Sequence, residues 1–276
     1  MIKKIFMLAA AMIMSLPLLQ AQESEGLKVM SYNIRLGSAQ DGTNSWALRY
    51  TATGTMLEDQ KPDVFGVQEA LEYQVRYIEE MCGYESVGVG RENGKKEGEH
   101  MSIFWNKKTV SMLKWGTFWL SETPEKPSKG WDAECFRTAT WALMKDKKTG
   151  KKFYFVNTHL DHKGTEAQKN GLKLIVDRIA EINPDGLPMV LTGDFNIEPK
   201  NPALKDLDAR MQSARKIAEK TDDHATYNGW GKSSTMIDYI YVSGFSSCPE
   251  YQTVTKRYED RKFISDHYPI FARLIF

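Results

Sequence analysis

Short acidic, amide and imidazole motifs recur at the polar ends of apolar runs in this sequence. In chain order they are Ser31-Tyr32-Asn33, Gln68-Glu69, Asn157-Thr158-His159-Leu160-Asp161, Gly193-Asp194-Phe195-Asn196, Ile237-Asp238-Tyr239 and Ser265-Asp266-His267. Carboxylates are the ligands that a hard cation such as Mg²⁺ prefers, and imidazoles beside acids can move protons near neutral pH. These are the residue types of a metal-assisted hydrolytic site, although any one motif alone is weak evidence.

In this order and combination, the motifs resemble the active site of the endonuclease/exonuclease/phosphatase superfamily of Mg²⁺-dependent phosphoesterases. The resemblance extends from about Lys28 to the C-terminus. It implies hydrolysis of a phosphoester substrate, with Mg²⁺ as the cofactor and Mn²⁺ as the alternative. It also implies the fold of that superfamily, a four-layer α/β sandwich in which two packed mixed β-sheets are flanked by helices.

Hydrolysis of a phosphoester explains why these groups would be needed together. The anionic oxygens of the ester repel a nucleophile, so a catalyst needs a cation, a base for water and an acid for the leaving oxygen. Glu69 follows the apolar run 63–67, so a buried strand would deliver its carboxylate to the rim of a sheet. A lone Glu there is more often a helix N-terminal acid. With the other motifs present, we expect Glu69 to be the principal metal ligand and Asp266 to complete the metal site. Asn33 would lie beside both metal and phosphate, as a ligand of the metal and a contact of the substrate.

The resemblance assigns most of the other motif residues to catalysis. Asp194 would orient or deprotonate the attacking water, and Asn196 would hydrogen-bond the phosphate. Their alternate spacing puts both side chains on the same side of an extended segment. His267, oriented by Asp238, would be the general base, and His159 would serve the phosphate or the leaving group. Whether Asp194 or His267 takes the proton from water stays open.

Three further residues are expected to support this chemistry. Asp161 is near enough in sequence to His159 to set its tautomer and raise its pKa, and we count it among the catalytic residues. Arg137 could make a bidentate contact to phosphate, with a surface arginine as the equal alternative. Glu99 resembles the acid that supports the first histidine in DNase I-like members.

The elements that must position these side chains are visible as periodic apolar segments. Runs rich in Val, Ile, Phe, Tyr and Trp predict strands at residues 27–32, 63–67, 101–105, 110–120, 138–144, 153–158, 188–191, 236–242 and 270–275. Helical patterns predict helices at residues 46–57, 71–81 and 165–182. This mixture of strand pairs and strand–helix units suits two packed sheets with helices outside.

The N-terminus has the pattern of a cleaved signal peptide over residues 1–21. Lys3 and Lys4 precede an apolar stretch, residues 5–19, that is too short for a stable membrane span. Residues 22–276 would then form one domain. We expect a periplasmic or secreted monomer with no integral membrane segment after removal of the signal.

Charge and motif details bear on the substrate. Without residues 1–21, the 37 Lys and Arg against 36 Asp and Glu become 35 against 36, a net charge of −1. A nonspecific nuclease binds mainly by neutralising phosphates, so this balance argues mildly against nucleic acid, which stays possible but is not favoured. Asn33-Ile34-Arg35-Leu36-Gly37 and Thr158-His159-Leu160-Asp161 also depart from the abasic-site repair members. We expect a small, sugar- or lipid-linked phosphoester, and a phosphodiester in particular. The alternatives are a secreted DNase I-like nuclease and a catalytically inactive binding module of the same fold.

Overall fold

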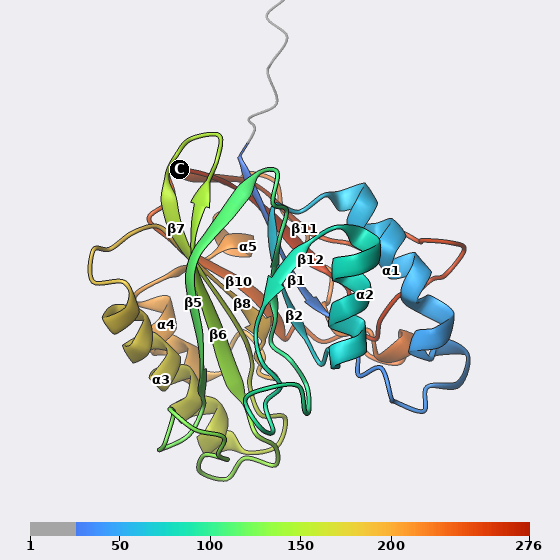
Figure 1. The fold of residues 1–276 in the computed structure, drawn as a ribbon, viewed down its shortest axis with the longest axis horizontal. Coiled ribbons are helices and arrows are strands. Elements are labelled where there is room, and N and C mark those ends of the chain that lie inside the picture. The colour runs from blue at the N-terminus through green and yellow to red at the C-terminus, as the bar shows by residue number, and fades with distance from the viewer. Residues whose placement is uncertain (1–25) are drawn as a thin grey trace, which may run out of the picture.

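Two six-stranded sheets make up the centre of the protein (Figure 1). The computed structural model describes residues 26–276, so the expected signal peptide lies outside the described residues. In spatial order, the first sheet contains β11 (Ser247–Thr253), β12 (Ile270–Ile275), β1 (Leu27–Asn33), β2 (Val64–Gln68), β4 (Ile103–Trp105) and β3 (Glu85–Val87). The second contains β5 (Val110–Trp119), β6 (Thr138–Asp146), β7 (Lys152–His159), β8 (Met189–Asp194), β10 (Asp238–Ser243) and β9 (Gln212–Ser213).

Helices cover the outer face of each sheet. α1 (Trp46–Gln60) and α2 (Glu72–Cys82) flank the first sheet, and α3 (Thr165–Ile182) flanks the second together with the short α4 (Lys205–Asp208) (Figure 1). A further short helix, α5 (Ala214–Ile217), follows β9. The resulting order of helices, sheet, sheet and helices confirms the four-layer α/β sandwich. Within residues 26–276, no helix is both long and apolar enough to span a bilayer.

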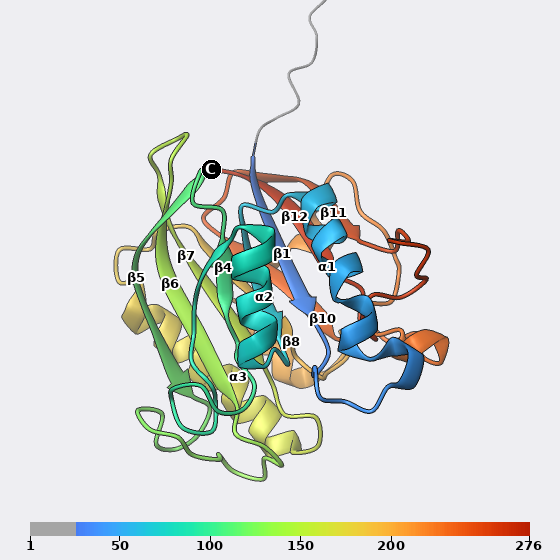
Figure 2. The same ribbon diagram turned by 45° about the vertical axis from the view of Figure 1, so that its right-hand side comes forward.

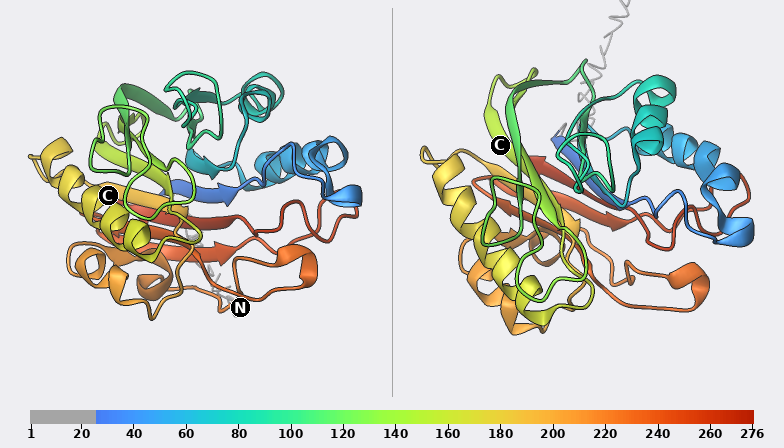
Figure 3. Two further views of the ribbon diagram at one scale, coloured as in Figure 1. Left: turned by 90° about the horizontal axis from the view of Figure 1, so that it is seen from below. Right: turned by 60° about the horizontal axis from the view of Figure 1, so that its bottom comes forward.

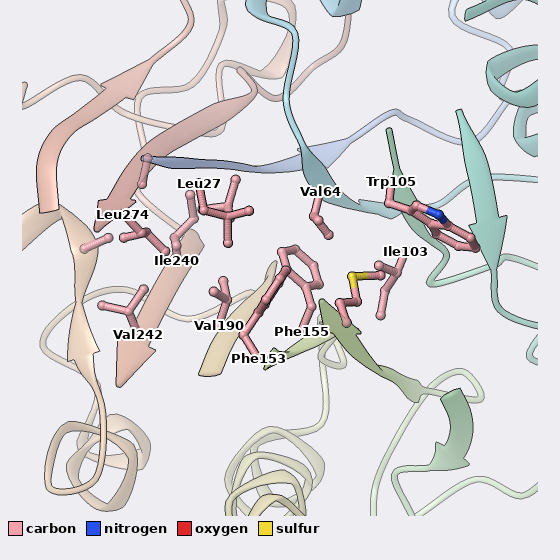
Figure 4. Close-up of a cluster of buried hydrophobic side chains, with 14 of the residues drawn as sticks. Leu27, Val64, Ile103, Trp105, Phe153, Phe155, Val190, Ile240, Val242 and Leu274 are labelled. Carbon is pink, nitrogen blue, oxygen red and sulfur yellow. The ribbon is translucent and has the colours of Figure 1, made fainter. Parts of the chain in front are cut away.

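Side chains that alternate between the two faces of each strand fill the layers between these elements. In β1, Leu27 and Val29 belong to the apolar cluster between the sheets, whereas Met30 and Tyr32 belong to the cluster under α1 and α2. Successive strand residues point to opposite faces, so a strand buried on both sides contributes to two cores. Figure 4 shows the cluster between the sheets, to which both sheets contribute side chains: Leu27, Val64, Ile103, Trp105 and Leu274 from the first, and Phe153, Phe155, Val190, Ile240 and Val242 from the second.

The face between the sheets changes from apolar to polar toward one end of the molecule. On β7, Phe155 is followed on the same face by Asn157 and then His159. On β8, the same face carries Val190 and, at the end of the strand, Asp194. His159 and Asp194 pair in register across the parallel strands β7 and β8. The strand period therefore delivers the polar motifs to one end of the sandwich, the end that faces the viewer in the left part of Figure 3.

The predicted strands and helices all occur, with boundaries that differ by a few residues. β1 lies inside the first sheet beside β12 and β2, as a fully buried apolar run should (Figure 2). Five short or irregular elements were not predicted from the sequence: β3, β9, β11, α4 and α5. β11 is an edge strand that contains Pro249 and shifts register between Ser247 and Glu250. Proline and a bulge are tolerated at a sheet edge, and they remove the alternation by which strands are predicted.

Candidate active site

A cluster of ligand-type side chains lies where the polar ends of the two sheets meet. Atoms of Glu69, His159 and Asp194 that could bind a metal lie within 4.8 Å of one another. These residues follow or end β2, β7 and β8, so the cluster is shared by both sheets. The structure thus brings together Glu69 and Asp194, which are 125 positions apart in the sequence.

Glu69 is held in place by its backbone and by two donors. Its φ of 64° is a left-handed conformation that few residues other than glycine adopt. Its Oε1 accepts from Asn33 Nδ2 at 3.0 Å and its Oε2 from the Leu36 backbone N–H at 2.8 Å. Burial opposes ionisation of this carboxyl, but the nearby His267 and these donors lower its pKa. Glu69 is therefore an ionised, fixed carboxylate.

Asn33 lies at the centre of the cluster and mainly donates to it. Its Nδ2 is 3.0 Å from Glu69 Oε1, 3.0 Å from Asp194 Oδ2 and 3.4 Å from His267 Nε2. Its Oδ1 accepts from the Arg35 backbone N–H at 3.0 Å. One lone pair of that oxygen remains available, so a role of Asn33 as a metal ligand or a phosphate contact stays a prediction.

His267 forms a charged dyad with Asp238, as the sequence predicted. Its Nδ1 lies 2.8 Å from Asp238 Oδ2, and its Nε2 lies 3.6 Å from Asp194 Oδ2. Burial would lower the pKa of this imidazole, but Asp238, Asp194 and Asp266 together raise it to about 10. His267 is therefore an imidazolium at neutral pH in the absence of a metal.

His159 is equally buried but is neutral rather than positively charged. Its Nε2 lies 3.0 Å from Asn196 Nδ2, which also donates to the Leu160 carbonyl at 3.0 Å. An amide N–H facing this nitrogen requires a lone pair there, so the ring proton is on Nδ1. Burial, Arg137 and Arg91 lower the pKa of His159 well below its usual value. His159 is neutral.

Asp194 lies between the two histidines. Its Oδ2 is 3.4 Å from His159 Nε2 and 3.6 Å from His267 Nε2, and its Oδ1 accepts from the Asn196 backbone N–H at 2.9 Å. Burial and the neighbouring Asp238 raise the pKa of Asp194 to about 7, against the opposing effect of His267. A carboxyl poised near neutral pH is suited to accept a proton.

Asp266 and Glu69 both lie near the guanidinium of Arg35. Arg35 Nη1 is 3.6 Å from Asp266 Oδ2 and 3.9 Å from Glu69 Oε2, while Arg35 Nε holds Asp41 Oδ2 at 2.9 Å. Asp266 is not among the ligand-type atoms that cluster within 4.8 Å. The expected place of Asp266 in the metal site therefore stays a prediction, and Arg35 is a neighbour that the sequence analysis did not include in the site.

Asp161 serves a structural purpose that the sequence analysis did not expect. Its two carboxylate oxygens accept the backbone N–H groups of residues 134, 135, 163 and 164 at distances between 2.9 and 3.2 Å. Burial would raise the pKa of Asp161, but these donors hold it far below its usual range. Among residues 26–276 it makes no hydrogen bond to His159 or Asp194. Asp161 therefore fastens two loops together, and its expected catalytic role stays a prediction.

Arg137 supports the same two loops from within. It is 5% exposed, with Nε 3.4 Å from Asp161 Oδ2 and Nη2 3.0 Å from His162 Nδ1. Its Nη1 is buried and has no hydrogen-bond partner among the described residues. This geometry excludes the surface-arginine alternative. A direct contact to the substrate phosphate stays a prediction.

Glu99 takes the position expected for an acid that supports His159. Its Oε2 lies 3.9 Å from His159 Nδ1 and 2.7 Å from Arg91 Nη1. Burial raises the pKa of Glu99, while Arg91 opposes that effect. Arg91 was missed in the sequence analysis because it lies in an irregular loop, where no periodicity indicates the direction of its side chain.

The donors present fit a hard divalent cation. Glu69 and Asp194 offer carboxylate oxygens, and Asn33 offers an amide oxygen with a free lone pair, which are the ligand types of Mg²⁺ and Mn²⁺. A structural zinc site would include cysteine thiols. Within residues 26–276, no thiol joins the cluster around Asp194.

Comparison with known proteins agrees with this geometry. The sequence model of the Endonuclease/Exonuclease/phosphatase family matches residues 30–267. A structure of a mannosyl-6-phosphatase from Bacteroides thetaiotaomicron VPI-5482 is similar with a TM-score of 0.86 and 32% identity, over 91% of this chain and 100% of that one. A family protein from Bacteroides vulgatus is similar with a TM-score of 0.85 and 34% identity, over 90% and 98% of the two chains. Among curated proteins, Sphingomyelinase C 2 of Leptospira interrogans is 24% identical over 250 residues, which are 76% of this chain and 39% of that protein.

Proposed function

The chain belongs to the Endonuclease/Exonuclease/phosphatase family and is a phosphoester hydrolase, and from this premise we propose that it removes phosphate from a small sugar phosphomonoester with Mg²⁺ as cofactor. The observation that carries the choice of substrate is the mannosyl-6-phosphatase, to which this chain is 32% identical over that protein's whole length. The sequence analysis favoured a phosphodiester, and we now place the sugar monoester first.

In the proposed reaction, Asp194 is the general base. In the metal-free protein, burial and Asp238 raise its pKa to about 7, and Asn33 Nδ2 and the Asn196 N–H fix its two oxygens. A water beside Oδ2 would give up its proton to this carboxylate as its oxygen bonds to phosphorus, while the bond from phosphorus to the sugar oxygen breaks and that oxygen takes a proton from solvent. We therefore favour Asp194 over His267 as the base, a choice that the sequence left open.

His267 then acts as a fixed positive charge rather than as a base. Its Nδ1–H donates to Asp238, and its Nε2–H faces Asp194 Oδ2 at 3.6 Å. A preorganised cation in a buried site stabilises the negative charge that grows on the phosphoryl oxygens in the transition state. Neutral His159, with Asn196, would complete the set of polar contacts to the phosphate.

Glu69 is the ligand to which we assign the cation, with Asp194 and Asn33 as its neighbours. A bound divalent cation neutralises phosphate charge and polarises the phosphoryl group. The carboxylates of the cluster would otherwise repel an anionic substrate.

A phosphoester panel with and without EDTA tests this proposal. The panel contains mannose 6-phosphate, another hexose 6-phosphate, a simple aryl phosphate, sphingomyelin and plasmid DNA. We expect Mg²⁺-dependent release of phosphate, with the highest kcat/KM on a sugar phosphate. Turnover confined to plasmid DNA would support the nuclease alternative, and no turnover of any ester would support an inactive binding module.

A lipid-linked phosphodiester is the second candidate, because of the similarity to Sphingomyelinase C 2. Faster turnover of sphingomyelin than of every monoester in the panel would promote it.

We also propose that the protein is exported as a monomer after cleavage behind residue 21. The charged and apolar pattern of residues 1–21 supports export. Fractionation of cells, with N-terminal sequencing and size determination of the mature protein, tests cleavage, location and oligomeric state.

A further inference from the structure

A layer of buried polar side chains lies directly beneath the site, between the two sheets. Its members are at most 1% exposed: Ser31 on β1, Gln68 on β2, Asn157 on β7 and Thr192 on β8. Asn157 stands two positions before His159 and shares its face of β7. Thr192 stands in the same relation to Asp194 on β8. Polar groups buried at this depth are costly unless each finds a partner.

The Asn157 side chain crosses from the second sheet to the first. Its Nδ2 donates to the Val67 carbonyl at 2.7 Å and to the Ser102 carbonyl at 3.2 Å. Its Oδ1 accepts from Gln68 Nε2 at 2.7 Å and from Thr192 Oγ1 at 3.1 Å. Both donors and both acceptor positions of the amide are filled. The amide therefore cannot turn without breaking several hydrogen bonds.

A glycine in β2 makes room for this amide. A Cβ on Gly66 would lie 2.3 Å from Asn157 Oδ1 and 2.7 Å from Thr192 Oγ1, which is inside van der Waals contact. Glycine normally weakens the interior of a strand, and it is found where another group approaches the backbone closely. Gly66 on the first sheet thus leaves the space that the Asn157 amide of the second sheet occupies.

This crossing joins the two strands that deliver opposite parts of the site. Val67 and Gln68 are the residues immediately before Glu69, whereas Asn157 precedes His159. β2 and β7 belong to different sheets, so no backbone ladder fixes the distance between them. Side chains must do so, and Asn157 bonds directly to the β2 backbone.

We propose that Asn157 is a positioning residue, whose amide holds β2 against β7 and thereby sets the distance of Glu69 from His159 and Asp194. The inference rests on the proposed function, because that distance matters for a cation and a phosphoryl group bound between these residues. Loosening the crossing lowers Mg²⁺ affinity and kcat together. Loss of outer partners of a metal site typically costs about 10–100-fold in affinity or activity.

Two variants weaken the crossing from opposite sheets without removing a site residue. Thr192→Val deletes one hydrogen bond to Asn157 and keeps the side-chain shape, and Gly66→Ala drives a methyl group into the amide. The Mg²⁺ dissociation constant is measured by calorimetry without substrate, beside kcat, KM and the melting temperature. We expect the dissociation constant to rise and kcat to fall by about tenfold or more in both variants. Thr192→Ser keeps the hydroxyl and should therefore retain the wild-type Mg²⁺ dissociation constant and kcat.

The matched control is Thr253→Val. Thr253 is a buried threonine on β11, and its hydroxyl donates to Asp222 Oδ1 at 2.9 Å, away from the site. This variant should lose thermal stability but keep the wild-type Mg²⁺ affinity and kcat. If Thr192→Val and Gly66→Ala behave like the control, Asn157 is merely structural and the inference is overturned. A wild-type protein that binds no Mg²⁺ and hydrolyses no ester overturns the proposed function itself, which is a separate result.

Discussion

His159 and His267 flank the same carboxylate, Asp194, yet their surroundings make His159 neutral and His267 positively charged. Both are 4% exposed, so burial does not distinguish them. His267 faces Asp238, Asp194 and Asp266, which raise its pKa to about 10. His159 has Arg137 and Arg91 nearby, and its pKa is lowered well below the usual value.

The difference shows that residue type alone does not assign acid and base roles. A histidine is neutral or charged according to the signs of the groups around it, and those groups come from distant parts of the chain. At this site the acidic side, formed by His267 and the aspartates around it, holds an imidazolium. The basic side, formed by His159 and the arginines near it, holds a neutral ring. Asp194, between them, is left as the group that titrates near pH 7.

Breaking the acidic side should have the largest effect. His267→Ala should lower kcat by about 10²–10⁴-fold, because an acid–base or charge-stabilising group is lost from the transition state. Asp238→Asn should give a loss of similar kind, because it leaves the imidazole without its orienting anion. Steady-state kinetics of both variants and of the double variant check this. Since the two residues act as a unit, the double variant should lose much less than the sum of the two free energies. Additive losses would show that they act independently.

Removing the charge that faces the cation should have the next largest effect. Glu69→Gln keeps the shape of the side chain, but it leaves the amide without the charge that offsets a divalent ion. The Mg²⁺ concentration for half-maximal activity should rise by about 10–100-fold. An Mg²⁺ titration of initial rates measures this, with Glu85→Gln as a control at an exposed carboxylate on β3. An unchanged midpoint would mean that Glu69 is not the principal ligand.

The acidic side should also make the stability of the metal-free protein depend on pH. The folded-state pKa of His267 is about 10, above its unfolded value of about 6.5, so its stabilising contribution is complete below pH 6.5 and is lost as pH rises through 10. Urea unfolding in EDTA should therefore show a loss on the order of a few kcal/mol between these values. Asp238→Asn should flatten this dependence. A wild-type stability that rises over the same interval would contradict the assigned charge.

The smallest expected effect concerns the protonation states of the two imidazole rings, which can be measured directly. Imidazole ¹⁵N NMR of the metal-free protein should show His267 protonated at pH 8 and His159 neutral at pH 6. Arg137→Gln removes a positive charge near His159 and should raise its pKa while leaving His267 unchanged. If both rings titrated with the same pKa, the assigned difference in charge between His159 and His267 would be wrong.

The sequence was sufficient for much of the fold because the central strands are long apolar runs. β1 and β7 could be predicted from Leu27 and Phe153 onward, since strands buried on both faces are nearly continuous in hydrophobic residues. β11 could not, because Pro249 and alternating polar residues are tolerated at an edge.

For the site, sequence reasoning identified the residues better than their charges. The dyad of His267 with Asp238 was predicted, and the hydrogen bond between them confirms the pairing. The neutral state of His159 was not predicted, because Arg91 approaches through a loop without periodicity. The loop contacts of Asp161 were not predicted for a related reason: its partners are backbone N–H groups, which no residue pattern reports.

The pairing of β1 with β12 has a consequence for how the protein folds. Leu27 pairs with Leu274 and Ser31 with Ile270, so a central ladder of the first sheet joins the two ends of the described chain. Contacts between residues so far apart form late, because closing a long loop costs entropy before the contacts repay it. Asn33 ends β1, and His267 lies just before β12. We therefore expect the centre of the site to be assembled only after β12 has docked beside β1.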